Sequence, residues 1–554
     1  MDEVWPWLAS LPPPTAGGLD APPPRSLPLA SSPDGASIVL QANAAATNTG
    51  GDPSRVATTV SVAINGAGGA ARAKWTSDAF TESSSPIPLR LQLLVQLINE
   101  VLALSPYAPC LGASAVNLAD SSFDAAMVDA SVVYAAVGEA STDASSALFT
   151  LALLLRLFWL CALDAPADAG YLFFRDLGAA IERELGASQP ALAVFLRSVG
   201  PDVEERFMRS LGYMLAKWCL LREMQAPPQE VPPRRRAFPA ACVSYATEAH
   251  GLWVLKGYAP VLAMARVTGA AASTSIAHES PEEETALRYG LAHQQLEAVA
   301  QVEYAVRVRD RRFLTVSVHV DNLRVRVSRL SFRKDDDDEA EDAAGADVAM
   351  DGERHFPSRI RLWVGPRLGA SYATGPSLGR STGNPERDVE TTRTVKGAFF
   401  ATKLGVAPGM KAKARTSVRT RSRSWRWEQE AEGSAGVFEG VLCDPVTGTE
   451  VSAWRPGVTG ATDPRNGMRR RYEGHGRAFS KMRGLVVAGD ELPEEVTWRV
   501  GREEEGRTLR WRIGLKVWVS YMPNEVRTRH FETRCVEWAH EVELPLIAIN
   551  GDES

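Results

Sequence analysis

Cysteine and histidine are scarce in this sequence: its 554 residues include six cysteines and eight histidines. No two cysteines form a Cys-x-x-Cys pair, which excludes a zinc ribbon and a thioredoxin-type redox motif. Six cysteines in so long a chain also exclude a disulfide-stapled scaffold. The histidines lack ligand spacing, and Walker, nucleophile-elbow and kinase motifs are missing, so the sequence predicts no metal site, no cofactor and no catalytic residue.

A targeting leader is the second missing feature. Met1–Trp5 carries two acids before any base, whereas a secretory leader begins with bases and a transit peptide is poor in acids. The most apolar run, Ala147–Leu163, is shorter than the span of about 20 residues that a bilayer needs, and it contains Arg156. We therefore expect a soluble protein with no transmembrane segment, in the cytoplasm or the nucleus, and a buried helix at this run.

What is present is an ordinary globular composition with unevenly placed charge. Hydrophobic residues make up 45% and charged residues 23% of the chain, as in folded domains. Residues 1–230 carry 23 acids and 13 bases, while the rest carries 44 acids and 48 bases. An acidic first part and a weakly basic second part predict two different surfaces, without naming a partner.

The first 85 residues are rich in helix breakers. Residues 1–36 form a tail with nine prolines, which excludes a long helix or a central strand there. Trp5 and Trp7 lie in this tail, and we expect them to dock onto a domain or onto a partner. Residues 37–85 read as a short β or irregular segment.

Residues 86–225 have the spacing of a helical domain. Apolar residues recur at helical intervals over 90–104, over 169–185 and over 201–222. Gly186 follows the second stretch and predicts its end, because glycine favours the position after a helix. Four or five helices of this kind predict a bundle.

The next two segments are less regular. Residues 226–239 contain five prolines and three consecutive arginines, which predicts a linker. Residues 240–301 read as mixed helical and extended, with a helix that opens at Pro281 and runs to about Val299.

Residues 302–549 change to a period of two, the spacing of half-buried strands. Apolar residues alternate with polar ones over 304–308, 314–327, 509–521 and 536–544. The sequence therefore predicts an α+β protein: an N-terminal helical bundle domain followed by a C-terminal antiparallel β-sandwich or barrel.

A glycine-rich segment, Gly66–Ala71, matches the G-x-G-x-x-A pattern of dinucleotide sites after an apolar stretch. Such a site needs a long helix after the glycines and a second strand that ends in an acid. Neither follows here, so the pattern favours a glycine-rich hairpin turn over a cofactor site.

An acidic segment lies inside the β-rich part. Residues 335–353 carry ten acids and no base. One interpretation is a calcium loop, but the spacing lacks the glycine-turned frame that six to eight oxygen ligands require. A solvated, disordered acidic loop is the favoured interpretation.

The candidate site is a run of basic residues at alternate positions, which a strand would place on one face. Trp425 and Trp427 are expected to continue that face, and cations beside aromatic rings suit nucleic acid or an anionic membrane. The alternative is a solvated strand whose cations pair with acids such as Glu428, Glu430 and Glu432. The candidate anion-binding residues are Lys411, Lys413, Arg415, Arg419, Arg421, Arg423, Trp425 and Trp427.

Three short segments resemble an uncharacterised land-plant family, some members of which are labelled erythronate-4-phosphate-dehydrogenase-like. They are the opening Met1–Pro13, Trp425–Glu428 and Cys443–Pro445. The label would imply a doubly wound sheet, NAD and an Arg/Glu/His catalytic set. The sequence departs from it, since it lacks βαβ alternation and its last part reads as all-β. We carry over no catalytic residue.

The sequence thus favours a non-enzymatic interaction protein with an unknown protein partner. The first alternative is a polyanion binder, for nucleic acid or anionic lipid, that acts through residues 411–427. The second alternative is an NAD-dependent dehydrogenase-like enzyme, which would require Gly66–Ala71 to open a Rossmann unit.

Overall fold

The computed structural model describes most, but not all, of the chain. The described residues are 1–11, 25–46, 56–66, 72–80, 88–106, 128–163, 165, 167–225, 241–261, 294–330, 354–379, 388–400, 409–421, 425–443, 450–451, 479, 484–488, 492, 495–522 and 533–547. They form helices and antiparallel sheets, so the α+β class is confirmed. The linker at 226–239, the acidic segment at 335–353 and residues 281–293 lie outside the described residues.

The chain divides into two compact units. The first comprises Met1–Thr247, Lys256–Ala298 and Val327–Met350, and the second comprises Glu248–Leu255, Val299–Arg326 and Asp351–Ser554.

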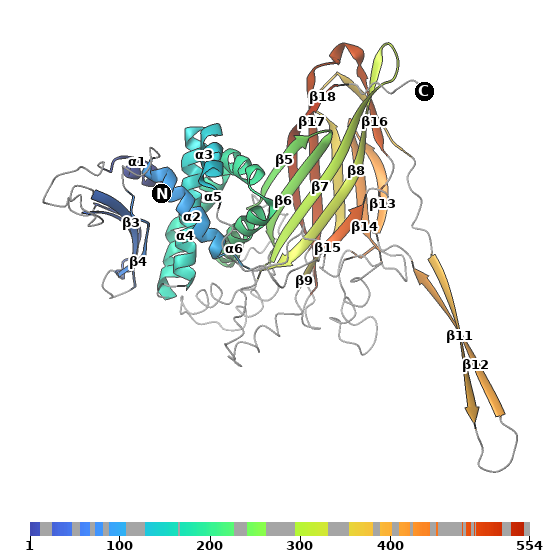
Figure 1. Cartoon of the computed structure of the whole chain (residues 1–554), viewed down its shortest axis with the longest axis horizontal. Helices are drawn as coiled ribbons and strands as arrows, with labels where there is room; N and C mark the ends of the chain where they lie inside the picture. The colour runs from blue at the N-terminus through green and yellow to red at the C-terminus, as the bar shows by residue number, and fades with distance from the viewer. Residues whose placement is uncertain are drawn as a thin grey trace. The chain divides into compact units, whose positions relative to one another are not determined.

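The first unit begins with a short helix and a small sheet (Figure 1). The helix is α1 (Val4–Ala9). The four-stranded antiparallel sheet follows chain order and consists of β1 (Arg25–Ser31), β2 (Ser37–Ala46), β3 (Val56–Asn65) and β4 (Arg72–Thr76). β1 is an edge strand and its register shifts after Pro28, which is where a sheet tolerates proline.

Helix α1 anchors the N-terminal end of the chain. Val4 and Leu8 are buried in the core of the first unit. The Trp5 ring lies 5.1 Å from that of Phe149, and the Arg90 guanidinium lies 4.5 Å from the Trp5 ring centre. The prediction that Trp5 docks onto a domain of this chain is confirmed.

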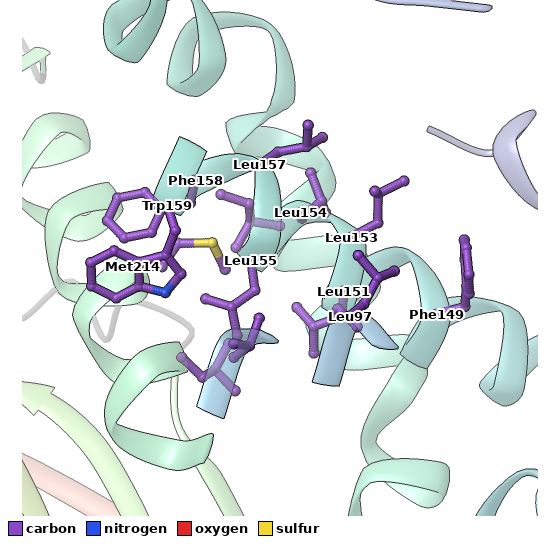
Figure 2. Packing of buried hydrophobic residues seen from close by; sticks show 14 of the residues in the cluster. Leu97, Phe149, Leu151, Leu153, Leu154, Leu155, Leu157, Phe158, Trp159 and Met214 are labelled. Atoms are coloured by element: carbon purple, nitrogen blue, oxygen red, sulfur yellow. The ribbon is translucent and has the colours of Figure 1, made fainter. Parts of the chain in front are cut away.

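Five further helices supply most of this core. They are α2 (Leu89–Ala103), α3 (Ala130–Glu139), α4 (Thr142–Leu163), α5 (Ala167–Ser198) and α6 (Pro201–Gln225). Figure 2 shows apolar side chains of α4 packed with Leu97 of α2 and Met214 of α6. Burial of these apolar faces is the main source of the bundle's stability.

Helix α4 contains the most apolar run of the sequence. Its segment Thr142–Ala162 is long and apolar enough to span a membrane, but 89% of the apolar 18-residue window within it is buried inside the protein. Arg156 donates to Glu100 at 2.5 Å, and the Trp75 indole donates to the same carboxylate oxygen at 2.7 Å. The charge of Arg156 inside the apolar run is therefore paired with a carboxylate of α2, which agrees with a core helix.

Helix α5 differs from the prediction, because it continues through Gly186 and Pro190 to Ser198. The predicted stop at Gly186 was wrong. Residues beyond the glycine, among them Leu192 and Phe195, are fully buried, so tertiary packing extends the helix past its local stop signals.

A seven-stranded antiparallel sheet has the order β10-β16-β8-β7-β6-β5, with β15 also paired to β8. Its strands are β5 (Val243–Ala249), β6 (Leu252–Val261), β7 (Gln294–Val308), β8 (Phe313–Arg329), β10 (Ala373–Ser377), β15 (Gly484–Ala488) and β16 (Val496–Gly501).

Strand β7 corrects a second prediction. Residues 294–299, expected to end a helix, form the first part of this strand. Gln294 to Ala298 are all buried, and burial then continues at every second position with Ala300 and Val302. Pairing with β6 and β8 decides this conformation, and such pairing is not visible in the local sequence.

A five-stranded antiparallel sheet has the order β13-β14-β9-β17-β18. Its strands are β9 (Arg354–Pro366), β13 (Trp425–Glu432), β14 (Ala435–Leu442), β17 (Thr508–Met522) and β18 (Thr533–Pro545). The apolar residues Leu509 to Val519 of β17 are buried at every second position, as the alternation predicts.

Tryptophans within the second unit join strands of these two sheets. The Trp511 ring of β17 lies 4.9 Å from that of Trp498 in β16 and 6.0 Å from that of Trp253 in β6. The Trp253 indole donates to the Glu543 carbonyl at 2.8 Å. These contacts bury large apolar rings, and the Trp253 indole keeps a hydrogen-bond acceptor.

Candidate functional site

The predicted basic strand is one arm of a separate hairpin. Strand β11 (Asp388–Phe400) pairs in antiparallel fashion with β12 (Gly409–Arg421), from Asp388 opposite Arg421 to Phe400 opposite Gly409. The two strands form a sheet of their own, drawn as a two-stranded ribbon in Figure 1. Threonine and valine recur in both arms, and these residues favour extended backbone.

One face of this hairpin, the basic face, holds five of the predicted site residues. They are Lys411, Lys413, Arg415, Arg419 and Arg421. Residues opposite one another share a face in an antiparallel pair, so β11 adds its own residues to this set.

The β11 residues divide the basic face into two parts. Asp388 stands opposite Arg421 and Glu390 opposite Arg419. Toward the other end, Thr394 stands opposite Arg415, Lys396 opposite Lys413 and Ala398 opposite Lys411. The half farther from Asp388 therefore carries four cations and no acid. One of these cations, Lys396, belongs to β11 and is not apparent from the spacing within β12 alone.

The second face, the apolar face, has a different composition. Arg393 is its one charged residue among the described strand positions. The face comprises Val389, Thr391, Arg393, Val395, Gly397 and Phe399 in β11, and Met410, Ala412, Ala414, Thr416, Val418 and Thr420 in β12.

The remaining predicted site residues do not extend the basic face. Arg423 lies outside the described residues. Trp425 and Trp427 belong to β13 in the five-stranded sheet. They are 7% and 8% exposed, and their rings stack at 6.2 Å. The prediction that Trp425 and Trp427 continue the basic face was wrong. Strand β12 ends at Arg421, and the next strand places both tryptophans among buried side chains.

Two of the three acids expected to neutralise the basic strand, Glu428 and Glu432, have partners in the five-stranded sheet. Glu428 pairs with Arg426 at 3.2 Å, and Glu432 pairs with Arg361 of β9 at 2.7 Å. Each of these acids has an ion-pair partner within the five-stranded sheet.

A cluster of buried ionisable groups forms a second candidate, inside the first unit. Glu204 of α6 is 1% exposed and accepts hydrogen bonds from the hydroxyls of Tyr245 at 2.8 Å and Tyr258 at 2.7 Å. Lys256 of β6 donates to its other oxygen at 2.5 Å. Three donors thus satisfy one buried carboxylate.

The cluster continues one helical turn along α6. Arg209 donates to Glu205 at 2.8 Å and lies 3.7 Å from Glu297 of β7. Gly212 follows, where an added Cβ would stand 1.8 Å from the Gln295 amide oxygen. The face of α6 is thus fitted closely to the strands.

The electrostatics of the cluster indicate a structural role. Burial, and then the Glu204 charge, raise the pKa of Tyr245 and of Tyr258 well above the ordinary tyrosine value. Both hydroxyls therefore stay protonated and keep donating at physiological pH. A carboxylate held by three donors in the core stabilises α6 on β5 and β6.

The glycine-rich segment joins β3 to β4, which pair in antiparallel fashion. The strand β4 stands where a dinucleotide site needs a helix, and Ala67–Ala71 lie outside the described residues. The hairpin interpretation of this segment is therefore confirmed for its two arms.

Neither a protein-family model nor a curated protein matches the chain. Among solved structures, the chain is similar to the Clostridium perfringens NetB toxin in its membrane-inserted form, with a TM-score of 0.20 and 6% identity over 55% of this chain and 93% of that chain. It is also similar to Clostridium perfringens delta-toxin, with a TM-score of 0.20 and 8% identity over 55% and 96%. A structure described as a pore forming protein gives 0.19 and 5% over 54% and 94%. TM-scores this low do not establish a common fold, and the land-plant resemblance stays a prediction.

Proposed function

We propose that this chain is a non-enzymatic binding protein whose β11–β12 hairpin takes a phosphate-bearing polyanion. Nucleic acid and anionic lipid share that chemistry. The observation that carries the proposal is the grouping of Lys396, Lys411, Lys413 and Arg415 on one face, with no acid at the opposing positions. Four like charges on one face repel one another, and an anion that lies among them offsets this repulsion.

The spacing of these cations suits an extended anionic surface. Alternate residues of a strand stand about 6.6–6.8 Å apart. Phosphate groups can therefore meet successive cations along the strand, and each neutralised phosphate releases bound counterions. Binding of this kind falls steeply as salt rises.

We take the five-stranded and seven-stranded sheets to be two layers of a β-sandwich, supported by the packing of Trp511 against Trp498 and Trp253. The hairpin follows β10 of one sheet and precedes β13 of the other along the chain, so both of its ends connect to ordered strands.

The experiment compares two triple variants with the same charge change. One replaces Lys411, Lys413 and Arg415 with serine. The control replaces the exposed Arg309, Arg311 and Arg312, at the turn between β7 and β8, with serine. Binding to heparin, single-stranded RNA and anionic vesicles is measured over a range of salt concentrations.

The hairpin variant should lower the slope of log affinity against log salt by about two to three for nucleic acid, because three phosphate contacts are lost. The control should retain the parent slope. Equal losses in both variants would show that net charge alone drives binding, and the hairpin proposal would fail.

A further inference from the structure

We propose that the polyanion is the surface of an anionic lipid bilayer, and that the hairpin lies in the headgroup region with its apolar face toward the acyl chains. This inference rests on the proposed function, since it assigns the source of the phosphates. It adds an observation that polyanion binding does not use: the composition of the second face.

The two faces contrast most in the half of the hairpin farther from Asp388. There the basic face carries Lys396, Lys411, Lys413 and Arg415. The apolar face of the same half carries Val395, Gly397 and Phe399 opposite Ala414, Ala412 and Met410. Seven residues of strand extend about 23 Å at 3.3–3.4 Å per residue. One segment thus combines a cationic side and an apolar side, as interfacial membrane elements do.

The apolar face changes in composition along β11. Arg393 stands on the apolar face nearer to Asp388, so we place the boundary of the lipid-contacting part between Arg393 and Val395.

The open edges of the ribbon set the depth of binding. In the described part of the chain, β11 and β12 pair only with each other. Unpaired backbone N–H and C=O groups are unfavourable in hydrocarbon but are hydrated among the headgroups. The hairpin therefore lies in the interface and does not cross the bilayer as a single copy.

Nucleic acid is the competing source of phosphate, and the structure favours lipid over it. Binding of single strands relies on aromatic rings that stack on bases. One aromatic residue, Phe400, shares the basic face. Trp425 and Trp427, which were expected to continue that face, are buried in β13. A nucleic acid on the basic face would also leave the apolar face without a role.

The test separates the two faces in the full chain. The apolar variant replaces Val395 and Phe399 with serine, the charge variant is the Lys411, Lys413 and Arg415 triple serine, and the control is the Arg309, Arg311 and Arg312 triple serine. Each is added to vesicles of equimolar phosphatidylserine and phosphatidylcholine, to vesicles of phosphatidylcholine alone, and to single-stranded RNA. Sedimentation of bound protein gives the affinities for vesicles, and fluorescence anisotropy of labelled RNA gives the affinity for RNA.

We expect the parent to prefer the phosphatidylserine vesicles, and each removed cation to weaken that binding about fivefold. The apolar variant should weaken vesicle binding about tenfold or more, because less apolar surface is buried. It should leave RNA affinity unchanged. Circular dichroism checks that each variant retains the secondary-structure content of the parent.

Two results overturn different statements. If the charge variant loses affinity for vesicles and RNA while the apolar variant loses none for vesicles, the polyanion site stands and the bilayer inference fails. If the charge variant binds every probe as the parent does, the proposed function itself fails. A parent that binds RNA more tightly than the phosphatidylserine vesicles also overturns the bilayer inference.

Discussion

The hydroxyl of Tyr258, in β6, donates a hydrogen bond of 2.7 Å to the carboxylate of Glu204, in α6. The two residues are 54 positions apart in the sequence. Tyr245 and Lys256 converge on the same carboxylate, so one buried acid holds a helix against two strands.

Replacement of Glu204 by alanine should lower the free energy of unfolding by about 3 kcal/mol, because three buried or partly buried donors lose their acceptor. This loss lies at the lower end of the range expected for breaking a buried ion pair, because the Lys256 side chain is 24% exposed. Urea denaturation followed by the helical circular dichroism signal measures the change. Asp202→Ala is the matched control, since it removes an exposed acid from the same first turn of α6 and should cost about 0.3–1 kcal/mol.

Lys217 predicts a pH dependence. Burial lowers the pKa of this lysine from 10.5 to about 8. Between these values the unfolded chain binds the proton more strongly than the folded chain, so this lysine makes stability rise as pH increases from about 8 to about 10.5. Below pH 8 both states are protonated and the unfavourable contribution is fully present.

Lys217→Met should therefore raise the free energy of unfolding at neutral pH, by at most about 3 kcal/mol. The gain should shrink as pH rises above 8. The difference between variant and parent is the quantity to measure, since burial also raises the pKa of the Cys161 and Cys242 thiols to about 12. Those thiols lower stability above pH 9 in both proteins equally. A gain that does not change with pH would contradict the assignment.

Two glycines of α5 form a matched pair. A Cβ at Gly178 would stand 2.2 Å from the Trp218 ring, which stacks on Phe174 and donates to Glu182. A Cβ at Gly186 would meet nothing within 4 Å. Gly178→Ala should destabilise the helix bundle by about 1–3 kcal/mol through overpacking.

Gly186→Ala should instead stabilise the bundle by about 0.5–1 kcal/mol, since alanine favours a helix interior. Thermal unfolding of both variants gives the comparison. A destabilising Gly186→Ala would support the helix end that the sequence predicted at this residue and would contradict the continuous helix α5.

The elements that the sequence predicted well are those whose own periodicity is strong. The spacing of Leu94, Ile98 and Val101 identifies α2, and the alternation of Leu509 through Val519 identifies β17. The failures depend on partners far along the chain. The first residues of β7 follow a helix-opening Pro-Glu-Glu-Glu run, yet pairing with β6 and β8 makes them a strand.

In the candidate site, too, local spacing predicted some features, while others depend on a partner strand. Alternating cations predicted the strand β12, and the register confirms that five of them share a face. The contribution of Lys396, and the acids opposite Arg419 and Arg421, depend on a partner strand that local spacing does not reveal. Trp425 and Trp427 continue the alternate spacing of the cations in the sequence. They belong to another sheet, because β12 ends at Arg421 and β13 begins at Trp425.

The antiparallel pairing of β3 and β4 predicts that the glycine-rich segment binds no dinucleotide. The strand β4 begins at Arg72, where a dinucleotide site would need the N-terminus of a helix. Calorimetric titration with NAD or NADP should give no saturable heat at millimolar ligand. A micromolar dissociation constant that Gly68→Val abolishes would restore the dehydrogenase hypothesis.

The last prediction concerns the two charge runs of the sequence. Residues 335–353 carry ten acids and no base, and the basic face of the hairpin carries the cations of β12 and Lys396. Opposite charges in water attract weakly pair by pair. A tether within one chain raises their effective concentration toward the millimolar range. We therefore expect the acidic segment to compete with external polyanions for the basic face.

A variant of unchanged length, with the ten acids replaced by asparagine or glutamine, should bind phosphatidylserine vesicles and heparin more tightly than the parent at low salt. The gain should shrink as salt rises, because screening weakens the internal competitor. The control permutes the order of residues 335–353 and keeps their charge, so it should bind as the parent does. Adding the Lys411, Lys413 and Arg415 triple serine to the neutralised variant should remove the gain, since the competition acts at those cations. An unchanged affinity of the neutralised variant at low salt would show that the acidic segment does not compete for the hairpin.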